Sequence, residues 1–170
     1  LDIKKFHIHG FDSFEGMPEH QGESDAHPDW GKGEMSSPES LIHSKAKALG
    51  FPLENLHLYK GYYEKTLTQE LQNKLKEMPP ALVNIDCDFY SSTVIALKWL
   101  KPIMSSGTIV RFDDYWAFHG SPNHGEIKAI NEFNAENDGH LAHFPILGLN
   151  SYSFIYSRKH FEYIDATKQN

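Results

Sequence analysis

Apolar and polar residues come in alternating blocks along this chain, and the blocks change regularly from strand-like to helix-like. Short apolar runs predict β-strands at about 5–10, 55–61, 81–86 and 107–113. Apolar residues that recur every three or four positions predict helices at about 36–49, 66–78, 92–101 and 123–136. The segments 140–146 and 151–157 predict two closing strands that lie close enough for an antiparallel pair.

This order of elements predicts an α/β fold. Strands that alternate with helices favour a mostly parallel sheet with helices on both faces, here completed by the antiparallel C-terminal pair. The predicted strands at 81–86 and 107–113 lack polar alternation, as expected when both faces of a strand are covered. A chain of 170 residues suits one domain with a substantial core, so we expect a single domain over 1–170.

Local residues mark the ends of the first two helices. Ser36–Glu39 and Thr66–Gln69 each have the spacing of a capping box, and Gly50 is a suitable C-terminal stop. We expect the apolar stripe of each helix to face the core. The stripes are Leu41, Ile42, Ala46 and Leu49 in the first helix, and Leu67, Leu71, Leu75 and Met78 in the second.

The segment 15–37 predicts a long loop, because it is rich in glycine, proline, serine and acidic residues. Loops of this length are uncommon unless they serve as lids or are disordered, so we interpret it as lid-like. Trp30 in this segment is a candidate, with Trp116 and Phe118, for an apolar cover over a bound ligand. Packing of the same rings in the core is an equally good interpretation.

Two apolar runs end abruptly in carboxylates. Asp86 and Asp88 follow the third predicted strand, and Asp113 and Asp114 follow the fourth. Ligands of open α/β sheets bind beyond the carboxyl ends of the strands, and one helical crossover fits between these two runs. We therefore expect the four acids to share a crevice, where protonation or a bound cation must relieve their repulsion. A competing interpretation is that individual acids cap helices or brace turns.

The composition of the chain limits the classes of molecule that it is expected to bind. The net charge is −7 with histidine neutral, and basic residues do not cluster, which argues against nucleic acid and acidic membranes. No apolar run approaches the roughly 18 residues that span a bilayer. The single cysteine, Cys87, excludes an internal disulfide, so we expect a cytoplasmic protein. The neighbouring acids should raise the pKa of Cys87, which argues against a nucleophilic role.

Four segments resemble one protein family in order and spacing. They are "GFDSFEGMP" (10–18), "KGYYEKTL" (60–67), "IDCDFYSST" (85–93) and "VRFDDY" (110–115). The chain is similar here to the macrocin O-methyltransferase family of S-adenosylmethionine-dependent sugar methyltransferases. The resemblance implies a Rossmann-like class I methyltransferase fold, a Mg²⁺ site, and an acceptor hydroxyl on a sugar or similar polyol-bearing molecule.

The resemblance also assigns roles to individual residues. Asp88 matches the proposed general base of the family, and Asp12 matches the acid that holds the ribose of the cofactor. Ser13 and Gly61 fall in segments that line the cofactor pocket. The positions that match the metal ligands are Asp86, Asp113 and Asp114. Oxygen-only ligands of this kind suit Mg²⁺, which agrees with the interpretation from the residues alone.

The family pattern includes a strand and a glycine-rich turn ahead of the segment that begins at residue 5, and neither is found in this sequence. We expect the domain to be incomplete at its N-terminus; supply of the missing part by another chain, or loss of catalysis, are the alternatives. Sheet edges left open in this way would favour a homo-oligomer. Arg111 is unusual inside a buried parallel strand and is expected at a sheet edge.

Two other functions stay open. A haloacid-dehalogenase-type phosphatase also carries strand–Asp-x-Asp and strand–Asp-Asp motifs, but Tyr90 stands where that superfamily has Thr or Val. A non-catalytic binding or assembly protein on a methyltransferase-like scaffold would explain the missing glycine-rich turn. His119 and His124 follow the second acid pair in a loop and are candidates for reaching the metal or the substrate; solvent-facing histidines are the simpler interpretation.

Overall fold

The computed structural model describes residues 5–136 and 138–158. The strands are β1 Ile8–Asp12, β2 Leu56–Lys60, β3 Leu82–Ile85, β4 Ile109–Phe112, β5 His140–Leu147 and β6 Tyr152–Ser157. The α-helices are α1 Glu39–Ala48, α2 Tyr63–Thr66, α3 Gln69–Leu75, α4 Tyr90–Leu100 and α5 Gly125–Ala135. None of these helices is long and apolar enough to cross a membrane.

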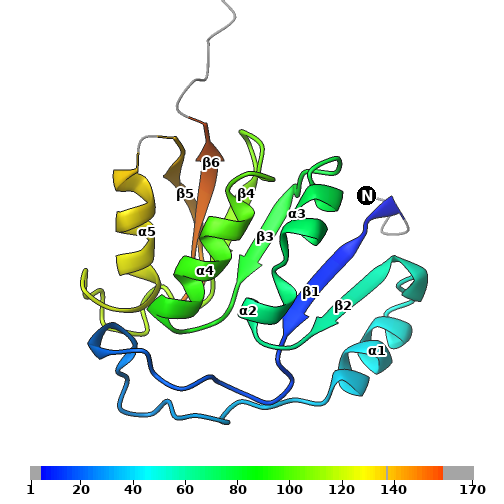
Figure 1. The fold of residues 1–170 in the computed structure, drawn as a ribbon, viewed down its shortest axis with the longest axis horizontal. Coiled ribbons are helices and arrows are strands. Elements are labelled where there is room, and N and C mark those ends of the chain that lie inside the picture. Colours follow the sequence, from blue (N-terminus) through cyan, green and yellow to red (C-terminus); the bar gives the residue numbers. More distant parts are fainter. Residues whose placement is uncertain (1–4, 137, 159–170) are drawn as a thin grey trace, which may run out of the picture.

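The strands form two sheets that lie next to each other (Figure 1). In the first sheet β1 and β2 are parallel and in register from Ile8↔Leu56 to Asp12↔Lys60. The second sheet has the order β3-β4-β6-β5, with β3 and β4 parallel and the other two pairs antiparallel. The antiparallel C-terminal pair is therefore confirmed. Strands β1 to β4 all end on the same side of the molecule, at the lower edge of Figure 1.

The main core lies between the four-stranded sheet and the helices α4 and α5. Apolar residues of β4 and β6 pack there against apolar residues of both helices, because the inward faces of all four elements are hydrophobic. Phe112 and Phe154, for example, meet edge to face with ring centroids 5.5 Å apart. The fully buried large side chains in this core include Leu97, Met104, Val110, Leu141 and Tyr156.

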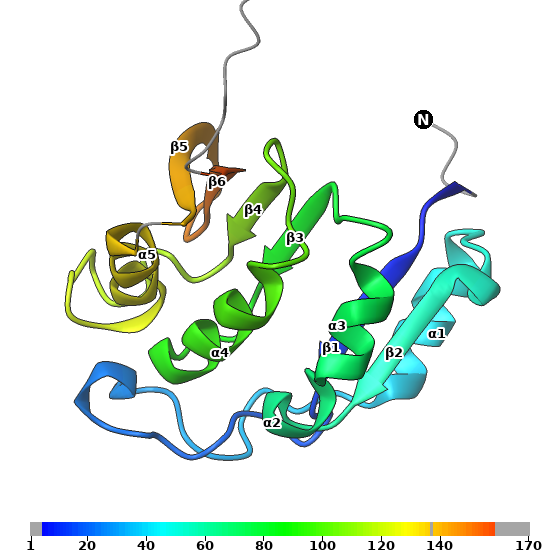
Figure 2. The same cartoon turned by 45° about the horizontal axis from the view of Figure 1, so that its top comes forward.

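A smaller core connects the two sheets through Trp99 of α4. Its ring meets Phe11 of β1 edge to face at 5.4 Å, and its Nε1–H donates to the Thr68 carbonyl at 2.9 Å. Gln72 of α3 donates in turn to the Trp99 carbonyl at 2.7 Å. Figure 2 shows α3 in front of β1 and α1 behind β2, so helices cover opposite sides of the two-stranded sheet. Trp99 of α4 therefore contacts both β1 and α3, and so connects the two-stranded sheet with the helices of the four-stranded sheet.

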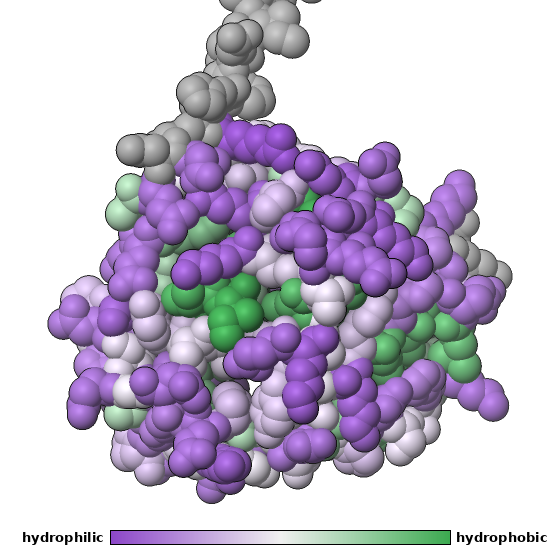
Figure 3. Space-filling view, viewed as in Figure 1, coloured by the Kyte–Doolittle hydropathy of each residue, from purple (hydrophilic) through white to green (hydrophobic). Residues whose placement is uncertain are grey.

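The expected burial of the first helix is wrong. No residue of α1 is buried, and Leu49 is 77% exposed at its C-terminal end. Hydrophobic side chains reach the surface around α1 and β2, on the right of the space-filling view (Figure 3). The predicted box at Ser36–Glu39 is also wrong, because Pro38 occupies the N-cap position and no side chain caps the helix. Gly50 does end the helix, with φ 69° and its N–H bonded to the Lys47 carbonyl.

The second predicted helix, at 66–78, corresponds to the shorter helix α3, and α2 ends at Thr66, where the prediction began. The expected capping box at Thr66–Gln69 is wrong because Thr68 is the N-cap of α3, and its Oγ1 accepts the Leu71 N–H at 3.2 Å. Thr66 instead donates its hydroxyl to the Tyr62 carbonyl. Leu75 is buried as expected, whereas Met78 lies beyond the helix and is exposed.

Candidate functional site

Parallel pairing of β3 and β4 brings acidic residues together at the ends of these strands. Ile85 and Phe112 are register partners, and the Asp113 N–H continues the ladder by donating to the Ile85 carbonyl at 3.0 Å. The residues that follow the two strands are therefore neighbours. One carboxylate oxygen from each of Asp86, Asp113 and Asp114 lies within 4.8 Å of the others. The sequence predicted this convergence from strand ends alone.

Asp88 sits in a strained turn beside this cluster. Its φ is 61°, in the left-handed region that residues other than glycine rarely adopt, although aspartate and asparagine tolerate it best. The Phe89 N–H donates to the Cys87 carbonyl at 2.6 Å, which closes a three-residue turn with Asp88 at its centre. Phe89 is fully buried and anchors the turn. From this turn the Asp88 side chain is hydrogen-bonded to the Asp114 side chain.

The carboxyls of this cluster repel one another. Burial, and then the charge and hydrogen bond of Asp114, raise the pKa of Asp88 to about 8. Burial followed by the charges of Asp113 and Asp114 raises the pKa of Asp86, and burial also raises that of Asp114. A cation held among these oxygens would stabilise the charged forms and relieve the repulsion.

Arg111, in β4, partly compensates the negative charge of the acid cluster. Its guanidinium forms an ion pair with Asp113 and donates to Asn84 Oδ1 at 2.7 Å. The expected position at a sheet edge is wrong, since β4 lies between β3 and β6. The side chain leaves the face of the sheet that α4 and α5 do not cover, which explains how a charged residue fits into an apolar strand.

A cavity of about 390 Å³ connects the acid cluster to the ends of β1 and β2. All seven site residues expected from the sequence line it: Asp12, Ser13, Gly61, Asp86, Asp88, Asp113 and Asp114. The Gly61 N–H donates to the Asp12 carbonyl at 2.9 Å, so the ends of the two strands are fixed to each other. Asp12 accepts the Phe14 N–H, and the Ser13 hydroxyl donates to the Gly16 carbonyl at 2.9 Å.

The segment 15–37 folds back on itself at the base of this cavity. The Met17 N–H donates to the Glu34 carbonyl, and the Gly33 N–H donates to the Met17 carbonyl, both at 2.9 Å. Gly16 is needed at this crossing, because a Cβ there would lie 2.4 Å from the Glu34 carbonyl oxygen, and its φ is 87°. Met17 is buried. The first residues of the segment are thus fixed against its last ones.

Asp25 connects this segment to α4, and sequence reasoning missed it. The side chain is 1% exposed, and Oδ1 accepts the Ser91 N–H at the start of α4 while Oδ2 accepts the Gln21 N–H, each at 2.9 Å. A carboxylate at a helix N-terminus is favoured by the helix dipole. The aspartate lies 66 positions before the amide that it caps, so no local spacing rule could have found it.

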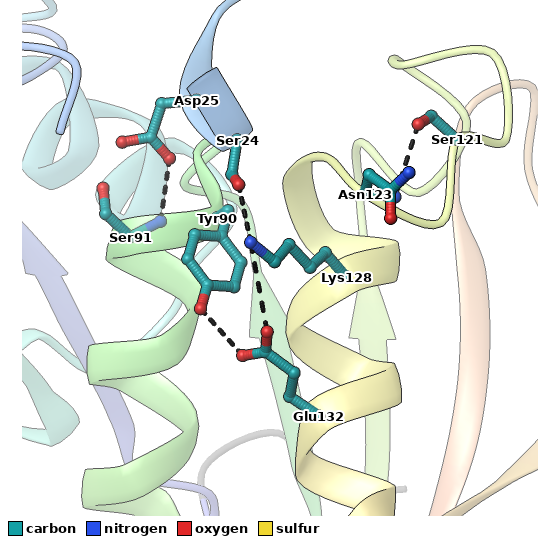
Figure 4. A network of polar contacts seen from close by, with 8 residues as sticks. All are labelled: Ser24, Asp25, Tyr90, Ser91, Ser121, Asn123, Lys128 and Glu132. Carbon is teal, nitrogen blue, oxygen red and sulfur yellow. Dashed lines mark hydrogen bonds and ion pairs between the residues drawn. The ribbon is translucent and has the colours of Figure 1, made fainter. Parts of the chain in front are cut away.

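A second set of contacts connects the segment to α5 (Figure 4). Lys128 donates to the Ser24 hydroxyl at 2.7 Å and lies 4.2 Å from the ring centroid of Tyr90. The Tyr90 hydroxyl donates to Glu132 at 2.7 Å. One lysine therefore joins the segment 15–37, α4 and α5 through a hydrogen bond and a cation–π contact.

Two of the three rings expected as an apolar cover meet each other, but neither Trp30 nor Phe118 lines the cavity. The Trp30 ring meets Phe118 edge to face at 5.5 Å, with His27 stacked on Trp30 at 4.0 Å. Trp116 does not join them: its ring contacts in the described residues are with Tyr115 and Tyr152. His124 pairs with the Ser121 hydroxyl and stacks on Phe118. Neither His119 nor His124 belongs to a potential metal-binding group among the described residues.

Glu126 is the second residue that sequence reasoning missed. It is 1% exposed in the first turn of α5, and its Oε2 accepts the Asp114 N–H at 3.1 Å. Burial and the charges of Asp114 and Asp88 raise its pKa well above the usual range. The spacing along the helix could have indicated that Glu126 is buried. It lies on the same helix face as Ile130 and Phe133, at the start of an apolar stripe.

Comparison with known proteins connects this geometry to a family. Residues 2–142 match the family model described as macrocin-O-methyltransferase (TylF). A curated relative from Streptomyces olivaceus, 8-demethyl-8-(2,3-dimethoxy-alpha-L-rhamnosyl)-tetracenomycin-C 4'-O-methyltransferase, is 29% identical over 109 residues, which are 61% of this chain and 40% of the relative. This chain therefore matches less than half the length of that relative.

Two solved structures share the fold. The calicheamicin methyltransferase CalS11 matches with a TM-score of 0.66 and 23% identity, covering 89% of this chain and 60% of that one. The O-methyltransferase NovP matches with a TM-score of 0.63 and 20% identity, covering 92% of this chain and 62% of that one. These matches confirm the predicted class I methyltransferase fold.

Proposed function

Because the chain belongs to the macrocin O-methyltransferase family, we propose that it carries the metal and acceptor site of a Mg²⁺-assisted O-methyltransferase. The proposed acceptor is a hydroxyl of a sugar or of another polyol-bearing small molecule, and the proposed methyl donor is S-adenosylmethionine. The convergence of four carboxylates in one cavity with Asp12, Ser13 and Gly61 is the observation that carries this proposal. Family membership leaves the phosphatase hypothesis without support.

The acid cluster suits a hard divalent cation. Asp86, Asp113 and Asp114 offer only oxygen ligands, and a Mg²⁺ site of this type leaves positions for water or substrate oxygens. The raised pKa values of Asp86 and Asp114 indicate a charge repulsion that a cation would relieve. Mg²⁺, when bound, would lower the pKa of a neighbouring hydroxyl.

The opposite end of the cavity suits the cofactor. Asp12 ends β1 with an exposed carboxylate, where it can accept hydrogen bonds from ribose hydroxyls. Gly61 has φ 139°, which favours glycine and allows a ligand to approach the backbone closely. S-adenosylmethionine, when bound, supplies a methyl group on a cationic sulfur that an oxygen nucleophile can displace.

Asp88 is the proposed general base. With S-adenosylmethionine bound, the Asp88 carboxylate would accept the proton that the acceptor hydroxyl loses when it is methylated. A bound cation would lower the pKa of Asp88 from the value of about 8 in the metal-free chain, so that the carboxyl would be ionised and able to accept the proton. The turn at Asp88 and the buried Phe89 hold the carboxyl in place during this step.

Two measurements on the chain test the proposal. We expect S-adenosylhomocysteine to bind in isothermal titration calorimetry, and radiolabelled methyl groups to appear in a sugar acceptor only when Mg²⁺ is present. Binding without methyl transfer to any acceptor of a nucleoside-diphosphate-sugar and glycoside panel would favour the non-catalytic binding protein. Absence of S-adenosylhomocysteine binding would contradict the proposal for this chain.

A further inference from the structure

We propose that Glu126 is a positioning residue for the candidate metal centre, acting through the backbone of Asp114. The inference rests on the proposed function, because it assigns the buried glutamate a task in that same centre. Glu126 itself has no place among the oxygens that approach one another within 4.8 Å. Its contact with the centre is the hydrogen bond from the Asp114 N–H to Oε2, at 3.1 Å.

Asp113 and Asp114 are adjacent in sequence but are held by different means. The Asp113 backbone is still part of the β-ladder through its bond to Ile85, and its carboxylate pairs with Arg111. Asp114 lies one residue past this ladder. Its carbonyl accepts the Ala117 N–H at 3.0 Å, and its own N–H needs a partner that the sheet does not supply. Glu126 supplies that partner and so fixes the direction of the Asp114 side chain.

The start of α5 is built to hold Glu126 in this position. Gly125 has φ 52°, and a Cβ there would come within 2.4 Å of the Phe118 ring, so the helix begins in contact with the loop that follows the acid pair. Ala129, Ile130 and Phe133 bury the same face of the helix in the core. The glutamate therefore projects from a rigid element toward a backbone amide, as is required of a residue that orients a ligand.

A burial cost supports a functional reason for an acid at this place. Glu126 Oε1 is buried and has no hydrogen-bond partner among the described residues. An apolar side chain would continue the stripe of Ile130 and Phe133 without this cost. Buried groups of this kind call for an explanation. The hydrogen bond from Asp114 gives such an explanation, because no apolar side chain could accept a hydrogen bond from the Asp114 N–H.

Three variants separate this role from simple packing. Glu126→Gln keeps an acceptor oxygen, and Glu126→Met keeps the shape but removes the acceptor. Glu70→Met is the matched control, because Glu70 is also the second residue of a helix, α3, and is exposed. Mn²⁺ serves as the probe, with its affinity for the chain measured by calorimetry. We expect Glu126→Met to weaken Mn²⁺ binding about tenfold or more, as losses behind metal ligands do, while Glu126→Gln and Glu70→Met stay close to the unaltered chain.

Equal Mn²⁺ affinity of the unaltered chain and Glu126→Met would overturn the inference while leaving the metal centre itself in place. Failure of the unaltered chain to bind Mn²⁺ would refute the metal assignment, and this inference with it. If Glu126→Met does not fold, hydrogen exchange of the Asp114 amide decides. The inference requires that amide to be protected in both the unaltered chain and Glu126→Gln, and rapid exchange in the unaltered chain would overturn it.

Discussion

The two sheets of this molecule differ in how well their apolar surfaces are covered. The four-stranded sheet packs against α4 and α5 around side chains that are fully buried, such as Phe112. The two-stranded sheet has α1 as a neighbour, yet α1 buries none of its residues. The proposed metal ligands and base follow strands of the well-packed half, whereas Asp12 ends β1 and Gly61 follows β2 in the other half. Metal binding and cofactor binding should therefore respond to different perturbations.

The largest expected effect separates chemistry from cofactor binding. Replacing the base in Asp88→Asn keeps the left-handed turn, because asparagine tolerates φ near 61°. Without a proton acceptor, methyl transfer should fall by about 10²- to 10⁴-fold, as measured by incorporation of labelled methyl groups. Affinity for S-adenosylhomocysteine should not change.

Asp12→Asn in the other half is the reciprocal variant. It should weaken S-adenosylhomocysteine binding and leave Mn²⁺ affinity unchanged, both measured by calorimetry. If Asp12→Asn also lost Mn²⁺ binding, or Asp88→Asn lost S-adenosylhomocysteine binding, the two ends of the cavity would not be separable, and the comparison between the halves would fail.

The second prediction concerns stability. Phe112→Ala removes a side chain that is 0% exposed in the main core and should lower the free energy of unfolding by about 3–5 kcal/mol. Leu49→Ala is the control in α1, where the side chain is 77% exposed, and should change it by less than about 0.5 kcal/mol. Urea denaturation followed by circular dichroism measures both. A large loss in Leu49→Ala would mean that another chain or segment covers this surface.

The third prediction tests the connection of the segment 15–37 to the well-packed half. Asp25→Ala removes the acceptor for the Ser91 N–H and should lower the free energy of unfolding by about 1–2 kcal/mol, the usual range for a lost helix cap. Asp25 ends a short 3₁₀ helix, Glu23–Asp25, and Glu23→Ala in the same helix should have little effect because Glu23 is exposed. We expect faster proteolysis within 15–37 in Asp25→Ala alone. Equal cleavage of both variants would show that Asp25 does not hold the segment.

The sequence predicted the half with the four-stranded sheet better than the half with the two-stranded sheet. The strands β3 and β4 and the meeting of their acids were predicted correctly, because apolar runs without polar alternation and a single crossover leave few arrangements. The face of α1 was predicted wrongly, because helical periodicity shows which side is apolar but not whether anything covers it. The boundaries of β1 were also displaced: parallel pairing with β2 carries the strand past Gly10 to Asp12.

The residues that were missed depend on contacts between distant segments. Asp25 caps a helix that begins 65 residues later, and Lys128 joins a loop 104 positions away. Thr68 was overlooked as the N-cap of α3 because Thr66 has the better spacing to Gln69. Glu126 was closer to being predictable, since an acid on an apolar helical stripe conflicts with burial unless it has a partner. Conflicts of this kind are expected at functional or strained positions.

The smallest expected effect is the pH dependence of the metal-free chain. The folded pKa of Asp88 is raised from 3.8 to about 8, so the folded state binds more protons than the unfolded state between these values. The stability that comes from the protonated carboxyl is fully present below pH 3.8 and is lost as the pH rises through about 8. In EDTA, Asp88→Asn should therefore melt at a higher temperature than the unaltered chain at pH 8.5, and the difference should shrink at pH 5.5. Added Mg²⁺ should stabilise the unaltered chain more at the higher pH, where the carboxylates are charged.

The two proteins share all their histidines, so comparing them at each pH cancels the effect of those residues. If the difference in melting temperature between Asp88→Asn and the unaltered chain were the same at both pH values, the acid cluster would not be under electrostatic repulsion.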